Sequence, residues 1–339
     1  MRWRAVLPWL FAVIGVLLLV LPLIGTPEYV VTLATLMLIY GIAAMALDIL
    51  VGFTGLVSFA QGAFFGVAAY GVGVATTEMG ITNFFAVSGF SVMLAVGLSV
   101  IVGLIALRAK GVGFIILTLA INELMWGLAY QWVAVSGGDN GLIGFVRPEL
   151  FGISLSGTDS FYWFSFGVLA ITGALMYLVV RSPFGLALKG IREQPRRMKA
   201  LGYNVWVYQY MAFIVAAFFA GIAGVLIAYY NEFVGTSILN LAQSTQFLIM
   251  TILGGTGTLW GSLLGSGIIV ALQNVISNYT MRWEMILGAI YVAVVMWAPE
   301  GILGVAQRLL TRRRRGRTAA KGVVEVRPGD EGTPQEGKG

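Results

Sequence analysis

The chain has 339 residues, of which 58% are hydrophobic and 11% are charged, and its mean hydropathy is +0.88. A soluble fold with so few charges would precipitate, so the composition indicates a polytopic membrane protein. The chain contains no Cys and no His, which excludes thiol catalysis, disulfide bonds, His-based triads and the usual zinc and haem ligand sets. The formal charge of +6 comes from basic residues clustered in loops and in the C-terminal tail, which favours a role in membrane topology and predicts no nucleic-acid partner.

The N-terminal segment predicts a first membrane span. Residues 1–4 include Arg2 and Arg4, and an apolar run over 5–23 follows them. A signal peptide has a shorter apolar core and a small-residue cleavage site, and neither is evident here. We therefore expect a retained span over 5–25, with the N-terminus in the cytoplasm.

Further apolar blocks long enough to cross a bilayer follow along the chain. With the first one they are 5–25, 29–50, 56–76, 84–107, 112–134, 161–180, 209–230, 241–258, 261–279 and 283–299. Short loops rich in Lys and Arg mark the cytoplasmic side. Arg108 and Lys110, the loop 181–199 and the run 312–315 all fall on that side, whereas the polar loop 135–160 falls outside. The pattern predicts an all-α, multi-pass transmembrane helix bundle of about ten spans with both termini in the cytoplasm.

Residues 1–305 form the predicted transmembrane domain, and 306–339 form a tail. Within the domain, 241–279 is either two spans or one span plus a re-entrant hairpin, because six glycines interrupt the apolar run: Gly254, Gly255, Gly257, Gly261, Gly265 and Gly267. The tail is basic and then contains Gly, Pro and Glu with little apolar content, so we expect it to be disordered. It would anchor the topology and contact anionic membrane lipid.

The longest polar interruption between apolar blocks is the loop 181–210. It carries six Lys and Arg residues against the single acid Glu193. Apolar positions recur at helical spacing, and so do basic ones, at Lys189, Arg192, Arg196 and Lys199. Pro195 predicts two short helices with the proline in the first turn of the second, and Gly202 predicts the end of that helix. Apolar Ala187, Ile191, Met198 and Leu201 complete a basic, amphipathic hairpin, which indicates a docking surface for a cytosolic partner.

Few ionisable residues lie within the apolar blocks. Glu123, beside Asn122, lies in the middle of block 112–134. A carboxylate at that depth is costly if it faces lipid, so we expect it to face the bundle interior or water, paired or protonated. It either lines or gates a pathway, or it makes a structural hydrogen bond between two helices. Asp48 is near the cytoplasmic end of its block, where a helix-end role is expected.

Glycines dominate the segment 52–70. Gly62, Gly66 and Tyr70 recur every four residues, which predicts a face that another helix approaches closely. Gln61 is the large polar residue of this segment, and it either faces a pathway or belongs to the packing.

A short internal echo links the two halves of the chain. Val51–Gly55 reads VGFTG and Leu253–Gly257 reads LGGTG. Gly-interrupted segments in both halves are typical of transporters with broken helices near the pathway. The candidate substrate pathway therefore comprises Thr54 and Gly55 together with Gln61, Asn122 and Glu123.

Five motifs in order carry a resemblance to a known family: GFTGLVSFAQGAFFGVAAYG (52–71), SGGDNGL (136–142), RSPFGLALKGIREQPRRMKALGYN (181–204), LGGTGTLWGSLLG (253–265) and APEGILG (298–304). Over about residues 30–305 the chain resembles the permeases of bacterial ABC importers for branched-chain amino acids, and it is most similar to the LivM-type subunit. Gln61 stands where that family often has His.

The resemblance implies a permease in the bacterial plasma (inner) membrane that pairs with a second, homologous permease subunit, two cytosolic ATPases and a periplasmic or lipid-anchored binding protein. It also implies that the loop 181–210 is the segment that couples to the ATPases. The coupling residues would be Phe184, Gly185, Ile191, Arg192, Glu193, Arg196, Met198, Ala200, Leu201 and Gly202.

The chain itself is expected to bind no cofactor, because it lacks a G-x-x-x-x-G-K-[ST] loop and ATP would be bound by the partner subunits. Permeases of this type for urea or short amides are an alternative. An ion-coupled secondary transporter is a further alternative, with Glu123 as its thin support. An intramembrane enzyme is not expected, because the sequence offers no His, no Cys and no convincing pair of acids.

Overall fold

The computed structural model describes residues 25–150 and 152–279, together with Pro22 and seven isolated positions between 282 and 301. The predicted span 283–299 and the predicted tail 306–339 lie outside this continuous part, as does nearly all of the predicted span 5–25.

Helices build the described part of the chain. The longer ones are α2 (Glu28–Asp48), α3 (Gln61–Thr77), α4 (Phe84–Ala106), α5 (Val112–Gln131), α7 (Thr158–Arg181), α10 (Val205–Asn231), α11 (Leu241–Gly254) and α12 (Leu259–Tyr279). The shorter ones are the π-helix η2 (Ile49–Thr54), which continues α2, and α6 (Val133–Ser136), η3 (Gly138–Asn140), α8 (Pro183–Glu193), α9 (Pro195–Ala200) and η4 (Thr236–Leu239).

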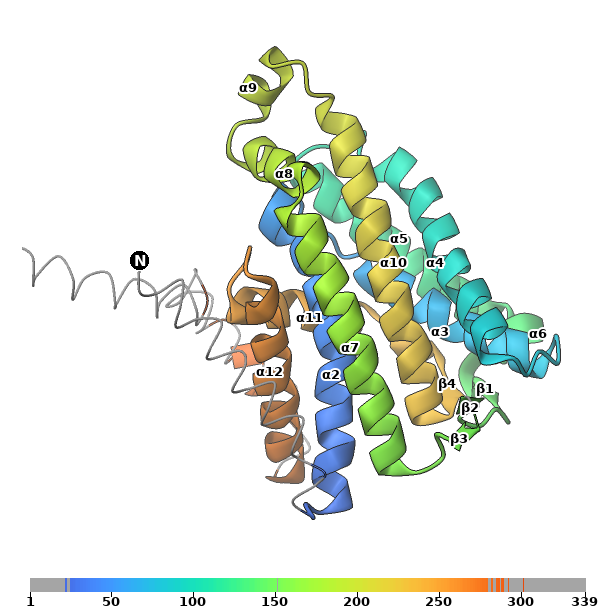
Figure 1. The fold of residues 1–339 in the computed structure, drawn as a ribbon. Helices are drawn as coiled ribbons and strands as arrows, with labels where there is room; N and C mark the ends of the chain where they lie inside the picture. The colour runs from blue at the N-terminus through green and yellow to red at the C-terminus, as the bar shows by residue number, and fades with distance from the viewer. Residues whose placement is uncertain are drawn as a thin grey trace, which may run out of the picture.

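Among the described residues, four two-residue strands lie between the helices. β1 (Leu142–Ile143) pairs antiparallel with β4 (Phe233–Val234), with Leu142 opposite Val234. β2 (Glu149–Leu150) pairs antiparallel with β3 (Ile153–Ser154). All four lie at one end of the bundle and α8 and α9 lie at the other (Figure 1), so we call these the β end and the α8 end.

The described residues contain six segments long and apolar enough to cross a membrane: Glu28–Thr54, Phe84–Ala106, Val112–Gln131, Thr158–Arg181, Val205–Asn231 and Leu259–Tyr279. The structure therefore confirms a helical transmembrane bundle, and the prediction of about ten spans goes beyond what it shows. The predicted block 56–76 forms a helix only from Gln61, and 241–258 becomes the 14-residue helix α11. At 1.5 Å per residue α11 is about 21 Å long, shorter than a hydrocarbon core of about 30 Å. Hydropathy counts apolar length, but it does not detect that Gly55 and Gly255 end their helices.

Two helices form the centre of the bundle. α2 packs against α7, α10 and α12, and α10 packs against α3 and α4 as well. In their most apolar stretches, 67% of Glu28–Thr54 and 72% of Val205–Asn231 is buried inside the chain, compared with 22% of α5. α5 therefore presents most of its surface to something other than its own chain.

Glycines let several of these helices meet backbone to backbone. A Cβ at Gly71 of α3 would lie 2.9 Å from Cα of Ser91 in α4. A Cβ at Gly265 of α12 would lie 2.9 Å from the backbone N of Gly254 in α11. Small residues at helix crossings allow this approach, as the sequence predicts for Gly62 and Gly66. In the structure Gly62 lies against Ser244 and Gly66 against Leu239.

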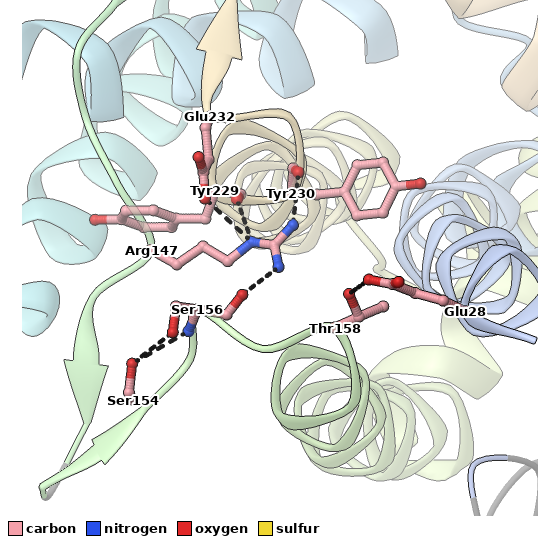
Figure 2. A network of polar contacts seen from close by, with 8 residues as sticks. All are labelled: Glu28, Arg147, Ser154, Ser156, Thr158, Tyr229, Tyr230 and Glu232. Atoms are coloured by element: carbon pink, nitrogen blue, oxygen red, sulfur yellow. Dashed lines mark hydrogen bonds and ion pairs between the residues drawn. The ribbon is translucent and has the colours of Figure 1, made fainter. Parts of the chain in front are cut away.

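At the β end, Arg147 connects the segment before α7 to the end of α10. Figure 2 shows its side chain directed at the end of α10. Its guanidinium donates hydrogen bonds to the carbonyl oxygens of Tyr229 and Tyr230, at 3.2 and 3.1 Å, and to that of Ser156 at 3.2 Å. The last carbonyls of a helix have no partner within it, and a cation there also complements the helix dipole. Arg147 thus holds the segment between β3 and α7 against the end of α10.

Candidate functional site

The connection from α7 to α10 folds as the two helices that the sequence predicts. Ser182 caps α8, accepting a hydrogen bond from the backbone N–H of Gly185 at 3.4 Å, and Pro183 occupies the first turn. Gln194 interrupts the helix, and Pro195 opens α9. α8 buries Gly185, Ala187, Leu188 and Ile191 beneath it. None of the residues of α9 is buried.

The predicted apolar face of this loop holds for three of its four members. Ala187 and Ile191 are buried, and Met198 packs back onto α8, with its Cε 3.2 Å from the position a Cβ would take at Gly190. Leu201, however, is 72% exposed. It follows the end of α9, so helical spacing no longer directs it toward the bundle. Ala200 is also exposed, and Gly202 has a positive φ of 89° just beyond the helix.

Aromatic contacts fix the root of α8. The ring of Phe184 stacks on that of Tyr208 in α10, with the ring centroids 5.7 Å apart and the planes inclined by 18°. Since Phe184 is the second residue of α8, this contact holds the start of the helix against the first turn of α10.

A basic cleft lies beside the break between α8 and α9. It has a volume of about 1030 Å³. Four cations line it, Arg108 and Lys110 from the α4–α5 loop and Arg196 and Lys199 from α9, together with the acid Glu193. Leu56 and Trp206 contribute apolar surface. Such a concave, cationic surface suits an acidic partner.

Arg192 differs from the cations that line the cleft. Its guanidinium turns inward and donates a hydrogen bond to the carbonyl oxygen of Gly52 in η2. Its Cγ lies 3.2 Å from the position a Cβ would take at Gly55. Thr54 is buried beside them and donates from its hydroxyl to the carbonyl oxygen of Leu50 at 2.6 Å. Thr54 and Gly55, predicted as pathway residues, therefore lie under α8.

Asn122 belongs to a second, fully buried cluster. Gln61 lies beside this cluster at the start of α3, but its amide donates instead to the carbonyl oxygen of Ala43 in α2 at 3.4 Å. The Asn122 amide donates to the carbonyl oxygen of Leu239 at 3.0 Å and accepts from the Ser244 hydroxyl at 3.0 Å. Ser244 in turn accepts from the backbone N–H of Gly62 at 2.8 Å, next to Gln61. Gln61, Asn122 and Ser244 are each 0% exposed. This polar cluster holds α3, α5 and α11 together at the point where α3 begins.

Glu123 lies apart from both groups. It is partly exposed on α5, on the side away from the buried Asn122. Its carboxylate has no hydrogen-bond or ion-pair partner among residues 25–150 and 152–279. The structure thus buries the amide residue of the Asn122–Glu123 pair and leaves the acidic one partly exposed.

Two features of the site escape sequence reasoning. Ser244 carries no charge, and its role as the centre of the buried cluster emerges only from the packing of α11. Asp48 accepts a hydrogen bond from Gly257, 209 positions along the chain; the echo between Val51–Gly55 and Leu253–Gly257 is the one sequence signal that connects the two segments. Within the described part, no group of three or more Asp or Glu side chains could hold a metal ion.

A family model and individual known proteins that match the chain share one description. Residues 29–295 match the family model described as branched-chain amino acid transport system / permease component. The chain is 26% identical to the high-affinity branched-chain amino acid transport system permease protein LivM of Escherichia coli (strain K12), over 86% of this chain and 73% of that protein. It is 27% identical to the LivM protein of Salmonella typhimurium (strain LT2), over 80% and 69% of the two chains.

A relative of the other permease type also matches. The chain is 28% identical to the probable branched-chain amino acid transport permease protein LivH of Methanocaldococcus jannaschii, over 76% of this chain and 86% of that protein. No solved structure matches the chain.

Proposed function

Because the chain belongs to the family of branched-chain amino acid transport system permease components, we propose that it is the membrane subunit of a bacterial ABC importer for branched-chain or related amino acids. Partner ATPases hydrolyse the ATP, and the chain supplies the conduit. The observation that carries this proposal is the structured basic hairpin of α8 and α9. Buried residues of α8 hold the hairpin against the bundle, whereas no residue of α9 is buried.

The basic cleft is the docking surface for the ATPases. Arg108, Lys110, Arg196 and Lys199 line it at the α8 end. An excess of Lys and Arg marks the cytoplasmic side of a membrane protein, which supports an orientation with this end in the cytosol and the β end outside. Cations around a concave surface orient an approaching acidic surface and set its register.

A second, homologous permease subunit covers the exposed side of α5. Ile116, Leu124 and Leu128 on this helix are 61%, 64% and 48% exposed. Glu123 lies among them, about 17 Å from the first residue of a helix that is about 30 Å long, and is therefore near mid-membrane. A carboxylate facing lipid there costs about 2.5–3.5 kcal/mol, so a second subunit or a water-filled route between the subunits is the better environment. Both LivM and LivH relatives match this chain, which supports pairing of two such permeases.

ATP dependence tests the proposal. The chain, purified with its ATPases and second permease and reconstituted in vesicles with its binding protein, should take up radiolabelled leucine only when ATP is present. Uptake should persist when an ionophore collapses the ion gradients. Uptake that needs the gradient and no ATP would overturn the proposal in favour of an ion-coupled transporter. ATP-dependent uptake of urea in place of leucine would keep the importer and change its substrate.

Glu123 provides a second expected outcome. Replacing Glu123 by Gln should lower the rate of ATP-dependent uptake while the vesicles keep the same amount of complex, because the change removes an acidic group beside the route. Glu78→Gln, an equivalent change at an exposed acid just beyond the end of α3, serves as the control and should leave uptake as it is. An E123Q complex with wild-type uptake would place Glu123 away from the route.

A further inference from the structure

Asp48 is a buried acid with an unusual environment. It ends α2 at the α8 end of the bundle and is 0% exposed. Its Oδ1 accepts a hydrogen bond from the backbone N–H of Gly257 at 2.7 Å, in the turn between α11 and α12. Its Oδ2 has no partner in the described part of the chain. Burying a carboxylate with one oxygen unsatisfied is costly, so generic packing does not account for an acid at this position.

The π-helix η2 and the α11–α12 turn meet backbone to backbone beside Asp48. A Cβ added to Gly52 would lie 2.7 Å from Cα of Gly257. Gly52 belongs to η2, at the end of α2, and Gly257 belongs to the α11–α12 turn. The echo between Val51–Gly55 and Leu253–Gly257 therefore corresponds to a physical contact between the two halves of the chain.

Helix α8 reaches the same junction. Arg192 donates a hydrogen bond to the Gly52 carbonyl oxygen, and a Cβ at Gly257 would lie 3.3 Å from its Nη1. Lys189, one turn earlier on α8, places its Nζ 4.9 Å from the centroid of the Phe53 ring. Both cations lie close to the buried Asp48 carboxylate. The end of α2, the α11–α12 turn and α8 are thus joined at one point.

We propose that Asp48 and Arg192 are positioning residues that make the α11–α12 turn follow α8. This inference rests on the proposed function, in which ATPases displace α8. The rigid guanidinium holds α8 to the Gly52 carbonyl, and Asp48 holds the end of α2 to Gly257. Because Gly52 and Gly257 touch through their backbones, no flexible side chain lies between them to absorb a displacement. A shift of α8 therefore reaches the broken helices of both halves.

Distances between spin labels test this directly, and the chain contains no native Cys to interfere. One label pair joins Leu186 on α8 to Met79 beyond α3, and the other joins Thr256 in the α11–α12 turn to Met79. The whole complex, with Cys-free partner subunits, is measured with and without ATP while hydrolysis is blocked. In the wild type both distances should change together. In Asp48→Ala and in Arg192→Met the Leu186 distance should still change, whereas the change at Thr256 should be lost.

The outcomes separate the two proposals. A Thr256 distance that keeps following α8 in both variants would overturn the positioning role. If ATP moves neither position in the wild type, the docking function of α8 itself fails. If Asp48→Ala does not fold, two other variants remain. Asp48→Asn retains Oδ1 as an acceptor for the Gly257 N–H. Arg192→Met changes an exposed side chain and keeps its apolar stem. Arg192→Lys should restore part of the coupled movement, and Asp159→Asn, at an exposed acid on α7, should behave as the wild type.

Discussion

Replacing Arg196 by Glu should reduce ATP-dependent uptake at least about tenfold, the change expected from a loss of about 1.4 kcal/mol at a docking surface. Arg196 lines the basic cleft, and no residue of α9 is buried, so the substitution costs the fold little. Uptake and ATP hydrolysis are measured in the same vesicles, with assembly checked by co-purification of the ATPases.

Arg197→Glu is the matched control, because it makes the same charge change on the same helix at a residue that does not line the cleft. We expect a clearly smaller loss for R197E, and a further loss when Lys199→Glu is added to R196E. Equal losses in R196E and R197E would assign the effect to the overall charge of α9. Wild-type uptake in R196E would refute docking at the cleft. Arg192 is unsuited to this experiment, since its contact with Gly52 mixes docking with the internal junction.

Replacing Gly265 by Leu should prevent stable folding. A Cβ at this position would lie 2.9 Å from the backbone N of Gly254 and equally close to the carbonyl carbon of Met250. Backbone atoms cannot move aside as a side chain can, so α11 and α12 would have to separate. Overpacking of a well-packed core costs typically 1–3 kcal/mol, and we expect about 3 kcal/mol or more here because backbone is involved. Size-exclusion elution and thermal melting of the detergent-solubilised protein measure the loss.

Gly267→Leu lies on the same helix two residues further on, and its Cβ would meet nothing within 4 Å. This variant should fold as the wild type does, or be more stable by up to about 1 kcal/mol, because Leu is a better helix former than Gly. If both variants fold equally well, α11 and α12 do not pack through Gly265.

Sequence reasoning recovers the elements whose signals are local. Apolar length predicts the long helices, and Pro195 predicts the break between α8 and α9, because both effects act within a few residues. Gly55 and Gly255 are visible as possible interruptions. Their consequences, that α3 begins only at Gln61 and that α11 stops after 14 residues, depend on where each chain segment resumes. The sequence leaves open whether 241–279 forms two spans or one span plus a re-entrant hairpin. The 14-residue length of α11 argues against two full spans.

The candidate site is harder to predict from the sequence, because its contacts join residues that are far apart along the chain. Glu123 attracts attention as a charge in an apolar block, yet its neutral neighbour Asn122 occupies the buried position. Apolar residues occur on every side of α5, so its sequence does not show which face meets its own bundle. Asp48 reads as an ordinary helix end until the fold brings Gly257 to it.

The difference in burial between α8 and α9 has a consequence for how the sequence of such a protein can change in evolution. One helix is anchored by four buried residues and the other by none. Under the proposed function, substitutions on α9 would change which ATPase is recognised without repacking the interior, whereas changes to α8 would disturb the transmembrane bundle itself. Partner choice and transport can then evolve at separate rates on adjoining turns of one loop.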